Sequence, residues 1–204
     1  MNPAETVDDS RQKKRDNPSS LDGIFRALCF AAYKHRDQRR KGECGSPYIN
    51  HPIEVAETLV RVGRITDPAL LQAAILHDTI EDTETSAEEL EAAFGPDVRQ
   101  LVVEVTDNKA LPKAERKQRQ IVHAHKLSSA ARELKIADKI CNVRDVTNKP
   151  PKDWPLERRV EYLAWSERVV AGCRGVNARL EQAFDAALAE GQAMMKVPGR
   201  RTSQ

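Results

Sequence analysis

Apolar residues recur every three or four positions along most of the chain, which is the spacing of a helix with one buried face. The first such stretch covers residues 21–32, and a second covers 53–60. A third runs from 68 to 77 behind Asp67, a residue type that caps helices. The charged segment 36–47, which contains two glycines, predicts a loop between the first two helices.

The second half of the chain continues in the same way. Ser86 and Glu89 have the spacing of a capping box, which predicts the start of another helix. Further helical patterns cover 98–105, 129–146 and 156–195, with an interruption at 172–175, and 112–125 is a charged helix or loop. No β-hairpin signal appears. We therefore predict an all-α fold of about eight or more helices, in one domain that spans residues 21–195.

Composition sets the limits of that domain and of its partners. Residues 1–20 hold too few apolar side chains to order themselves, so we expect a flexible N-terminal tail, and a frayed tail at 196–204. The 33 basic and 31 acidic side chains nearly cancel, leaving a net charge of +2. Nothing in this balance calls for a nucleic acid or a membrane as partner.

The cysteines and the hydropathy indicate a compartment. The chain has four cysteines, Cys29, Cys44, Cys141 and Cys173, and they form no C-x-x-C pair. This spacing favours free thiols in a reducing cytosol. No stretch approaches the roughly 20 apolar residues of a membrane span, and no signal peptide precedes the first helix. We expect a soluble cytoplasmic protein, and the sequence leaves open whether it forms a homo-oligomer.

Candidate chemistry begins where the third helix ends. A histidine and an aspartate, His77 and Asp78, directly follow an apolar run that predicts a buried helix. Their side chains project about 100° apart on a helix, so both would not reach solvent from a helix buried all round. A buried carboxylate needs a cation or several donors. A bound metal ion would satisfy both residues.

Two further residues complete a candidate metal shell. His51 precedes a proline at a helix start, and Asp138 lies within an apolar helical stretch. With His77 and Asp78 they offer nitrogen and oxygen ligands without thiolate, a set that suits Mn²⁺, Fe²⁺ or Zn²⁺ and leaves positions for water and substrate. Simpler explanations remain open. His51 is also explained as a cap or a packed core residue, and Asp138 as the salt-bridge partner of a nearby basic residue, either Lys135 or Arg144.

Charged residues surround this candidate shell in sequence. Glu81 and Asp82 stand four positions after the His-Asp pair, where carboxylates could orient or deprotonate a water on the metal. The alternative is a solvated acidic helix end. Basic residues gather at 36–41 and 109–126, and although most belong to solvated faces, one or two could bind an anionic substrate such as a phosphate.

Four motifs, in this order, resemble the HD-domain hydrolases of the Rel/Spo alarmone family, and most closely its small single-domain members. They are Lys41 with Ser46-Pro47-Tyr48-Ile49-Asn50-His51-Pro52, then Leu76-His77-Asp78-Thr79-Ile80-Glu81-Asp82-Thr83, then Val105-Thr106-Asp107-Asn108-Lys109, and then Lys135-Ile136-Ala137-Asp138-Lys139-Ile140-Cys141-Asn142-Val143-Arg144-Asp145. The resemblance extends from about residue 21 to about residue 190 and implies an all-helical HD fold.

The resemblance also implies roles for individual residues. The metal, Mn²⁺ in this family, would be held by His51, His77, Asp78 and Asp138. Glu81 and Asp82 would position and activate the attacking water. The remaining matches imply substrate contacts, namely Arg40 and Lys41 beside the base, Asn142 at the nucleoside, Tyr162 against the substrate, and Lys113 and Arg158 at its phosphates.

The implied reaction is removal of the 3′-pyrophosphate from a nucleotide alarmone, (p)ppGpp or (p)ppApp. Asp145 stands where bifunctional relatives often have a small hydroxyl residue, so both bases stay open. Members of this group also act on the 2′-phosphate of NADPH, which makes an NADPH phosphatase one alternative. A catalytically silent HD protein that senses or sequesters a nucleotide is the other. The Glu81-Asp82 pair argues for catalysis, since binding alone needs no water-activating residues.

Overall fold

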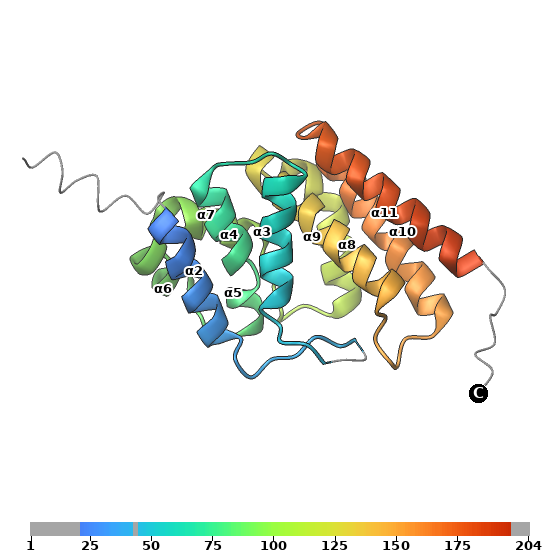
Figure 1. The fold of residues 1–204 in the computed structure, drawn as a ribbon, viewed down its shortest axis with the longest axis horizontal. Helices are drawn as coiled ribbons and strands as arrows, with labels where there is room; N and C mark the ends of the chain where they lie inside the picture. The colour runs from blue at the N-terminus through green and yellow to red at the C-terminus, as the bar shows by residue number, and fades with distance from the viewer. Residues whose placement is uncertain (1–20, 43–44, 197–204) are drawn as a thin grey trace, which may run out of the picture.

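The structure is a computed structural model that describes residues 21–42 and 45–196 (Figure 1). The expected N-terminal tail, 1–20, and residues 197–204 of the tail expected at 196–204 lie outside the described residues, while Lys196 is the last residue of a helix. Over the described ranges the fold is all-α as predicted, and its only strand-like pairing consists of two isolated bridges. The helices are α2 Leu21–Lys34, α3 Asn50–Arg61, α4 Pro68–Leu76, α5 Thr79–Asp82, α6 Ala87–Phe94, α7 Pro96–Val105, α8 Lys113–His123, the 3₁₀ turn η1 Ala124–Lys126, α9 Ser129–Asn148, α10 Leu156–Cys173 and α11 Ala178–Lys196.

Local signals in the sequence fix several helix ends. The side chain of Asp67 accepts a hydrogen bond from the backbone N–H of Ala69 at 3.0 Å and caps α4. Ser86 accepts from the N–H of Glu89 at 3.2 Å and caps α6. In a full capping box the carboxylate of Glu89 would accept from the backbone N–H of Ser86. Here it pairs with Lys34 on α2, at 2.9 Å, so Glu89 links α6 to α2.

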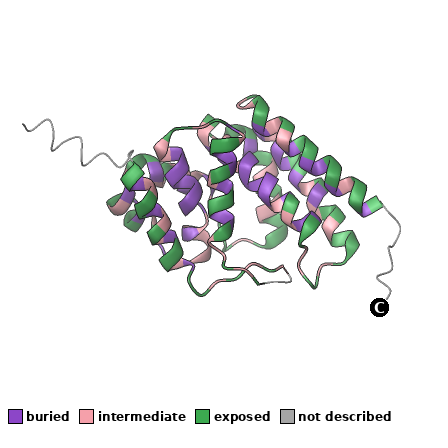
Figure 2. Ribbon diagram, viewed as in Figure 1, coloured by how far each residue is buried: buried purple, intermediate pink, exposed green. Residues whose placement is uncertain are grey.

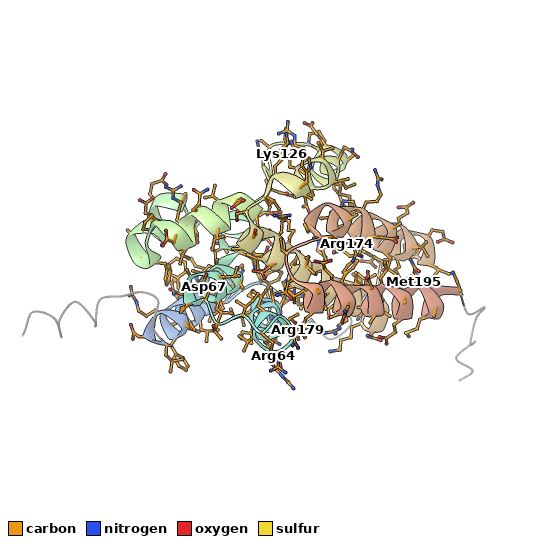
Figure 3. All side chains as sticks on the ribbon, turned by 90° about the horizontal axis from the view of Figure 1, so that it is seen from above. Arg64, Asp67, Lys126, Arg174, Arg179 and Met195 are labelled. Carbon is orange, nitrogen blue, oxygen red and sulfur yellow. The ribbon has the colours of Figure 1, made fainter. Side chains whose placement is uncertain are left out.

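The core gathers around α4 and α9. Residues 70–76 of α4 are all buried, because α2, α3 and α7 pack around this helix. Helix α9 contacts α3, α10 and α11, and it too is buried over much of its length (Figure 2). In the view of Figure 3, Arg64 and Arg179 lie near each other, where the chain leaving α3 meets the start of α11. Here the side-chain amide of Asn177 donates to the carbonyl of Gly63 at 3.0 Å.

Two loops meet at one end of the bundle. The loop between α2 and α3 pairs with the loop between α9 and α10 through a bridge from Gly42 to Pro151 (Figure 1). A Cβ on Gly42 would lie 3.0 Å from the carbonyl oxygen of Lys149, so the approach favours glycine. The charged segment that the sequence left as helix or loop forms α8, which is anchored by a hydrogen bond from Trp165 Nε1 to the carbonyl of Lys117, 3.1 Å long.

Candidate metal centre

Three core helices and one helical turn bring the candidate ligands together. His51 lies in the first turn of α3, and Asp138 lies in the middle of α9. His77 directly follows α4, and Asp78 directly precedes α5. Since α3, α4 and α9 all contact one another, these four positions converge although they are distant in sequence.

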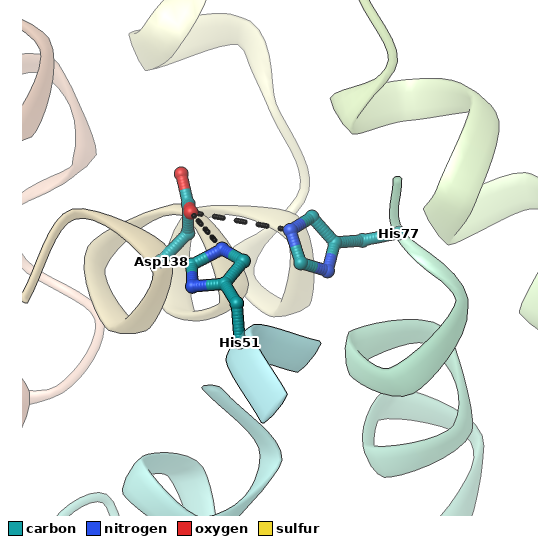
Figure 4. Close-up of side chains that lie close together, drawn as sticks. All are labelled: His51, His77 and Asp138. Carbon is teal, nitrogen blue, oxygen red and sulfur yellow. Dashed lines mark hydrogen bonds and ion pairs between the residues drawn. The ribbon is translucent and has the colours of Figure 1, made fainter. Parts of the chain in front are cut away.

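The side-chain atoms have the spacing of ligands around one ion. One atom each of His51, His77 and Asp138 lies within 4.8 Å of the other two, and all three residues are buried. Asp138 Oδ1 is 3.1 Å from His51 Nε2 and 3.9 Å from His77 Nε2 (Figure 4). Asp78 Oδ2 approaches the same imidazoles, at 3.1 Å from His77 Nε2 and 4.0 Å from His51 Nε2.

The hydrogen bonds of His77 favour a metal ligand. Its Nδ1 lies 2.7 Å from the carbonyl oxygen of Ala74, and because a carbonyl only accepts, Nδ1 carries the proton. Nε2 is then the ligating atom of the neutral ring, and it is buried without a hydrogen bond among the described residues. Metal-bound histidines are oriented in this way by a backbone carbonyl behind the ring. The cluster therefore fits a divalent ion.

The charges of the cluster call for a cation. Burial lowers the pKa of His77, but the carboxylates of Asp78 and Asp138 outweigh burial and raise it to about 9. Burial acts against the ionised form of Asp78, yet the nearby imidazoles hold its pKa well below the usual range. In the protein without metal, a protonated imidazole thus stands where an ion would neutralise the two carboxylates.

Neighbouring side chains hold the two carboxylates in place. The phenol of Tyr48 donates to Asp78 Oδ2 at 2.6 Å. Lys139 Nζ pairs with Asp138 Oδ2 at 2.9 Å, and the amide of Asn142 donates to Asp138 Oδ1 at 2.5 Å. The alternative partners of Asp138, Lys135 and Arg144, are used otherwise, since Lys135 donates to a backbone carbonyl and Arg144 is exposed.

Comparison with known proteins identifies the arrangement. The HD domain family matches residues 27–162, two thirds of the chain. The chain belongs to the HD-domain family. It is 49% identical over 166 residues to guanosine-3′,5′-bis(diphosphate) 3′-pyrophosphohydrolase MESH1 of Danio rerio, covering 81% of this chain and 92% of that protein. The protein of the same name from Homo sapiens is 51% identical over 161 residues, covering 79% and 90%.

A solved structure agrees with this family. It is described as a metazoan ortholog of SpoT that hydrolyses ppGpp and plays a role in starvation responses. The structures superpose with a TM-score of 0.80 at 47% sequence identity, covering 82% of this chain and 94% of that one. The resemblance to small Rel/Spo-type HD proteins is thereby confirmed.

The HD domain places two further carboxylates beside the candidate ligands. Glu81 and Asp82, both on α5, line a cavity of about 170 Å³ together with all four of them. Glu81 accepts from the backbone N–H of Asp107 at 3.2 Å and lies 3.4 Å from Arg116. Burial, followed by the charge of Asp107, raises the pKa of Glu81. Asp82 pairs with Lys109 at 2.5 Å. The pair faces a cavity, unlike Glu84, which is exposed.

The cavity of about 170 Å³ that the candidate ligands line is called the metal cavity. A larger pocket of about 360 Å³ adjoins it. The two share four lining residues: Tyr48, His51, Asp82 and Asn142. Among the predicted substrate contacts, Arg40, Lys41, Asn142 and Tyr162 line this pocket. Arg40 donates to Asp145 Oδ2 at 2.5 Å and to Asn142 Oδ1 at 3.1 Å, so its guanidinium is fixed against α9.

The other two predicted contacts lie outside the lining. The pKa of Lys113 is lowered by burial and by the positive charges of Arg158 and Lys41. Arg158 also stacks over the ring of Trp154, 4.3 Å from its centroid. Since Trp154 lines the pocket, Arg158 lies beside its rim, whereas Lys113 stays a predicted contact.

Sequence reasoning missed two residues of the site. Trp154 lines the pocket, and its ring centroid lies 5.5 Å from that of Tyr162. Its signal was its position, as one of two tryptophans in the chain and the one that sits among prolines in a loop. Tyr48 holds Asp78, and it stands only three positions before His51.

Proposed function

We propose that this HD protein is a divalent-metal-dependent nucleotide 3′-pyrophosphohydrolase that degrades (p)ppGpp or (p)ppApp to pyrophosphate and the 5′-nucleotide. One observation carries the proposal: a small cavity with metal ligands and an acidic pair adjoins a basic, aromatic pocket of nucleotide size. The relatives named as guanosine-3′,5′-bis(diphosphate) 3′-pyrophosphohydrolases support it.

Four residues would hold the ion: His51, His77, Asp78 and Asp138. Their nitrogen and oxygen atoms suit Mn²⁺, which we propose as the ion, and Fe²⁺ or Zn²⁺ fit the same set. When bound, the ion supplies positive charge that polarises the phosphoryl group and lowers the pKa of water.

None of the described helices combines the length and hydropathy of a membrane span.

The acidic pair supplies the proton chemistry. In the reaction the oxygen of water bonds to the inner phosphorus of the 3′-diphosphate, while the bond from that phosphorus to the 3′-oxygen breaks and the 3′-oxygen takes up a proton to leave as the 3′-hydroxyl. Glu81 takes the proton of the water, since its raised pKa makes it a better base than an exposed carboxylate. Asp82 lines both cavities and orients the water at their junction.

The larger pocket would hold the nucleoside. Tyr162 and Trp154 offer aromatic faces to a purine, and Arg40 offers donors. Asp145 adds an acceptor next to Arg40, so the base meets both a donor and an acceptor. Lys41, Lys113 and Arg158 would neutralise the 5′-phosphates.

The test is a product assay by anion exchange with purified protein and Mn²⁺. It offers ppGpp, ppApp and NADPH separately, with EDTA as the metal-free arm. The variant Glu81→Gln/Asp82→Asn should lose at least about a thousandfold in kcat while it still binds nucleotide, because it removes the base and the orienting carboxylate. Glu84→Gln, an exposed acid nearby, is the matched control and should keep full activity.

Each outcome assigns the reaction. Release of pyrophosphate that depends on metal, from one alarmone, supports the proposal and gives the base preference. Phosphate release from NADPH alone would replace it with a phosphatase. Nucleotide binding without turnover would replace it with a sensor protein.

A further inference from the structure

Two lysines one helical turn apart on α9 differ in their partners. Lys139 has the carboxylate of Asp138 at 2.9 Å, and although burial alone would lower its pKa, this charge raises it. Lys135 donates to the carbonyl oxygen of Val105 at 2.9 Å and has no carboxylate within ion-pair distance among the described residues. An ammonium has three donors, so Lys135 retains capacity for an anion.

Lys135 lies between two cavities. It lines the metal cavity, and it also lines a third cavity of about 190 Å³ beneath α8. Val105 and Gln120 are the other residues common to both cavities. Lys135 does not line the larger pocket proposed to hold the nucleoside, so it belongs to the part of the metal cavity that this pocket does not share.

The third cavity has basic groups that face it with unused donors. Arg116 lines it and pairs with Glu81 at 3.4 Å, but its Nε is buried without a hydrogen bond among the described residues. The two acids of the lining are already engaged. Glu104 accepts from the hydroxyl of Ser128 at 2.9 Å, and Asp107 accepts from the amide of Gln120 at 2.6 Å. The donors that remain free belong to Arg116 and Lys135, and the two carboxylates, bonded only to neutral groups here, keep their negative charge.

A 3′-diphosphate needs a second anion subsite. With the nucleoside in the larger pocket and the inner phosphoryl group at the metal ligands, the outer phosphate must extend away from the nucleoside. Lys135 is the cation found on that side of the cavity without a carboxylate partner. Asp138, Asp107 and Glu81 act on Lys135 through their charges, but none lies within ion-pair distance, so an outer phosphate would be its direct anionic partner.

We propose that Lys135, assisted by Arg116, binds the outer phosphate of the 3′-diphosphate, and that the third cavity receives the pyrophosphate as it leaves. This inference rests on the proposed function, because only a reaction that releases a diphosphate uses such a subsite. It makes Lys135 a determinant of diphosphate over monophosphate substrates.

The test is calorimetric titration of the full, Mn²⁺-loaded chain with inorganic pyrophosphate and, separately, with inorganic phosphate. Free Mn²⁺ is held constant, because pyrophosphate itself binds the ion. Lys135→Met should weaken pyrophosphate binding by about 10- to 100-fold, the loss expected for a charged hydrogen bond, and phosphate binding by less than about threefold. Lys135→Arg should restore most of the difference. Lys126→Met, which removes an exposed lysine that lines none of the three cavities, is the control.

The outcomes separate this inference from the proposed function. Equal weakening of both anions, or of neither, would overturn the subsite even if the wild-type protein hydrolyses alarmones. Selective loss of pyrophosphate binding in a protein that hydrolyses no alarmone would instead overturn the proposed function. Should Lys135→Met fold poorly by thermal denaturation, Arg116→Gln tests the same subsite and should weaken pyrophosphate more than phosphate.

Discussion

The metal cavity and the larger pocket, which we propose binds the nucleotide and call the nucleotide pocket, adjoin, yet they are built from different parts of the fold. His51, His77 and Asp138 are only 2%, 7% and 8% exposed, and they lie on or next to helices that pack in the core. The nucleotide pocket is lined mainly by two loops that pair through Gly42 and Pro151. A core cluster is fixed by packing, whereas loops are in general more mobile than the elements they connect.

This difference predicts how each region responds to substitution. The buried ligands share their charges, so loss of one leaves uncompensated charge in a low-dielectric site. Contacts in the pocket are more exposed, and water and salt screen them. We therefore expect changes in the cavity to abolish function and changes in the pocket to tune affinity.

The largest effect should follow from His77→Ala. Removing the ligand whose Nε2 faces both carboxylates should reduce metal content from about one ion per chain to below about a tenth, and activity by at least about a thousandfold. Elemental analysis of protein purified without a metal-affinity tag measures this directly. His125→Ala, at an exposed histidine, is the control. Unchanged metal content in His77→Ala would refute the ligand set.

A second effect is the pH dependence of metal binding. Since Asp78 and Asp138 raise the pKa of His77 to about 9 against the effect of burial, its ring is protonated below that pH and must release a proton to bind metal. Lowering the pH from about 8.5 to 6.5 should therefore weaken Mn²⁺ binding roughly a hundredfold. Arg40 stays charged throughout, because Asp145 outweighs burial and raises its already high pKa. Mn²⁺ titration followed by electron paramagnetic resonance tests this, and a flat affinity profile would contradict it.

The convergence of His51, His77 and Asp138 was predicted better than the lining of the larger pocket, while their roles as metal ligands stay predictions. Apolar spacing and caps such as Asp67 are local signals, so the helices and their order could be read directly. The adjacent His77 and Asp78 after an apolar run indicated a metal for the same local reason. The sequence did not show where α4 ends and α5 begins. His77 and Asp78 both keep helical backbone dihedral angles at this break, and no glycine or proline marks it.

The loops and the cavity under α8 could not be predicted, because they depend on contacts between distant segments. Nothing near Gly42 in sequence indicates that it meets Pro151. Lys135 reads as a surface or salt-bridge lysine, and only the packing of α8 and α9 places it between two cavities. Trp154 likewise gains its role from a loop whose position the sequence does not encode locally.

The smallest effect, and the sharpest test of the comparison, is expected for Arg40→Gln. This change removes the guanidinium proposed to donate to the base and leaves the carboxylate of Asp145 unpaired at the pocket wall, so KM should rise about tenfold while kcat changes less than about twofold. Arg36→Gln, outside the pocket, is the control. Arg40 also reaches Asp138 through Asn142, by bonds of 3.1 and 2.5 Å. If kcat and metal content fell together with affinity, this connection would make the cavity and the pocket one unit, and the distinction between them would fail.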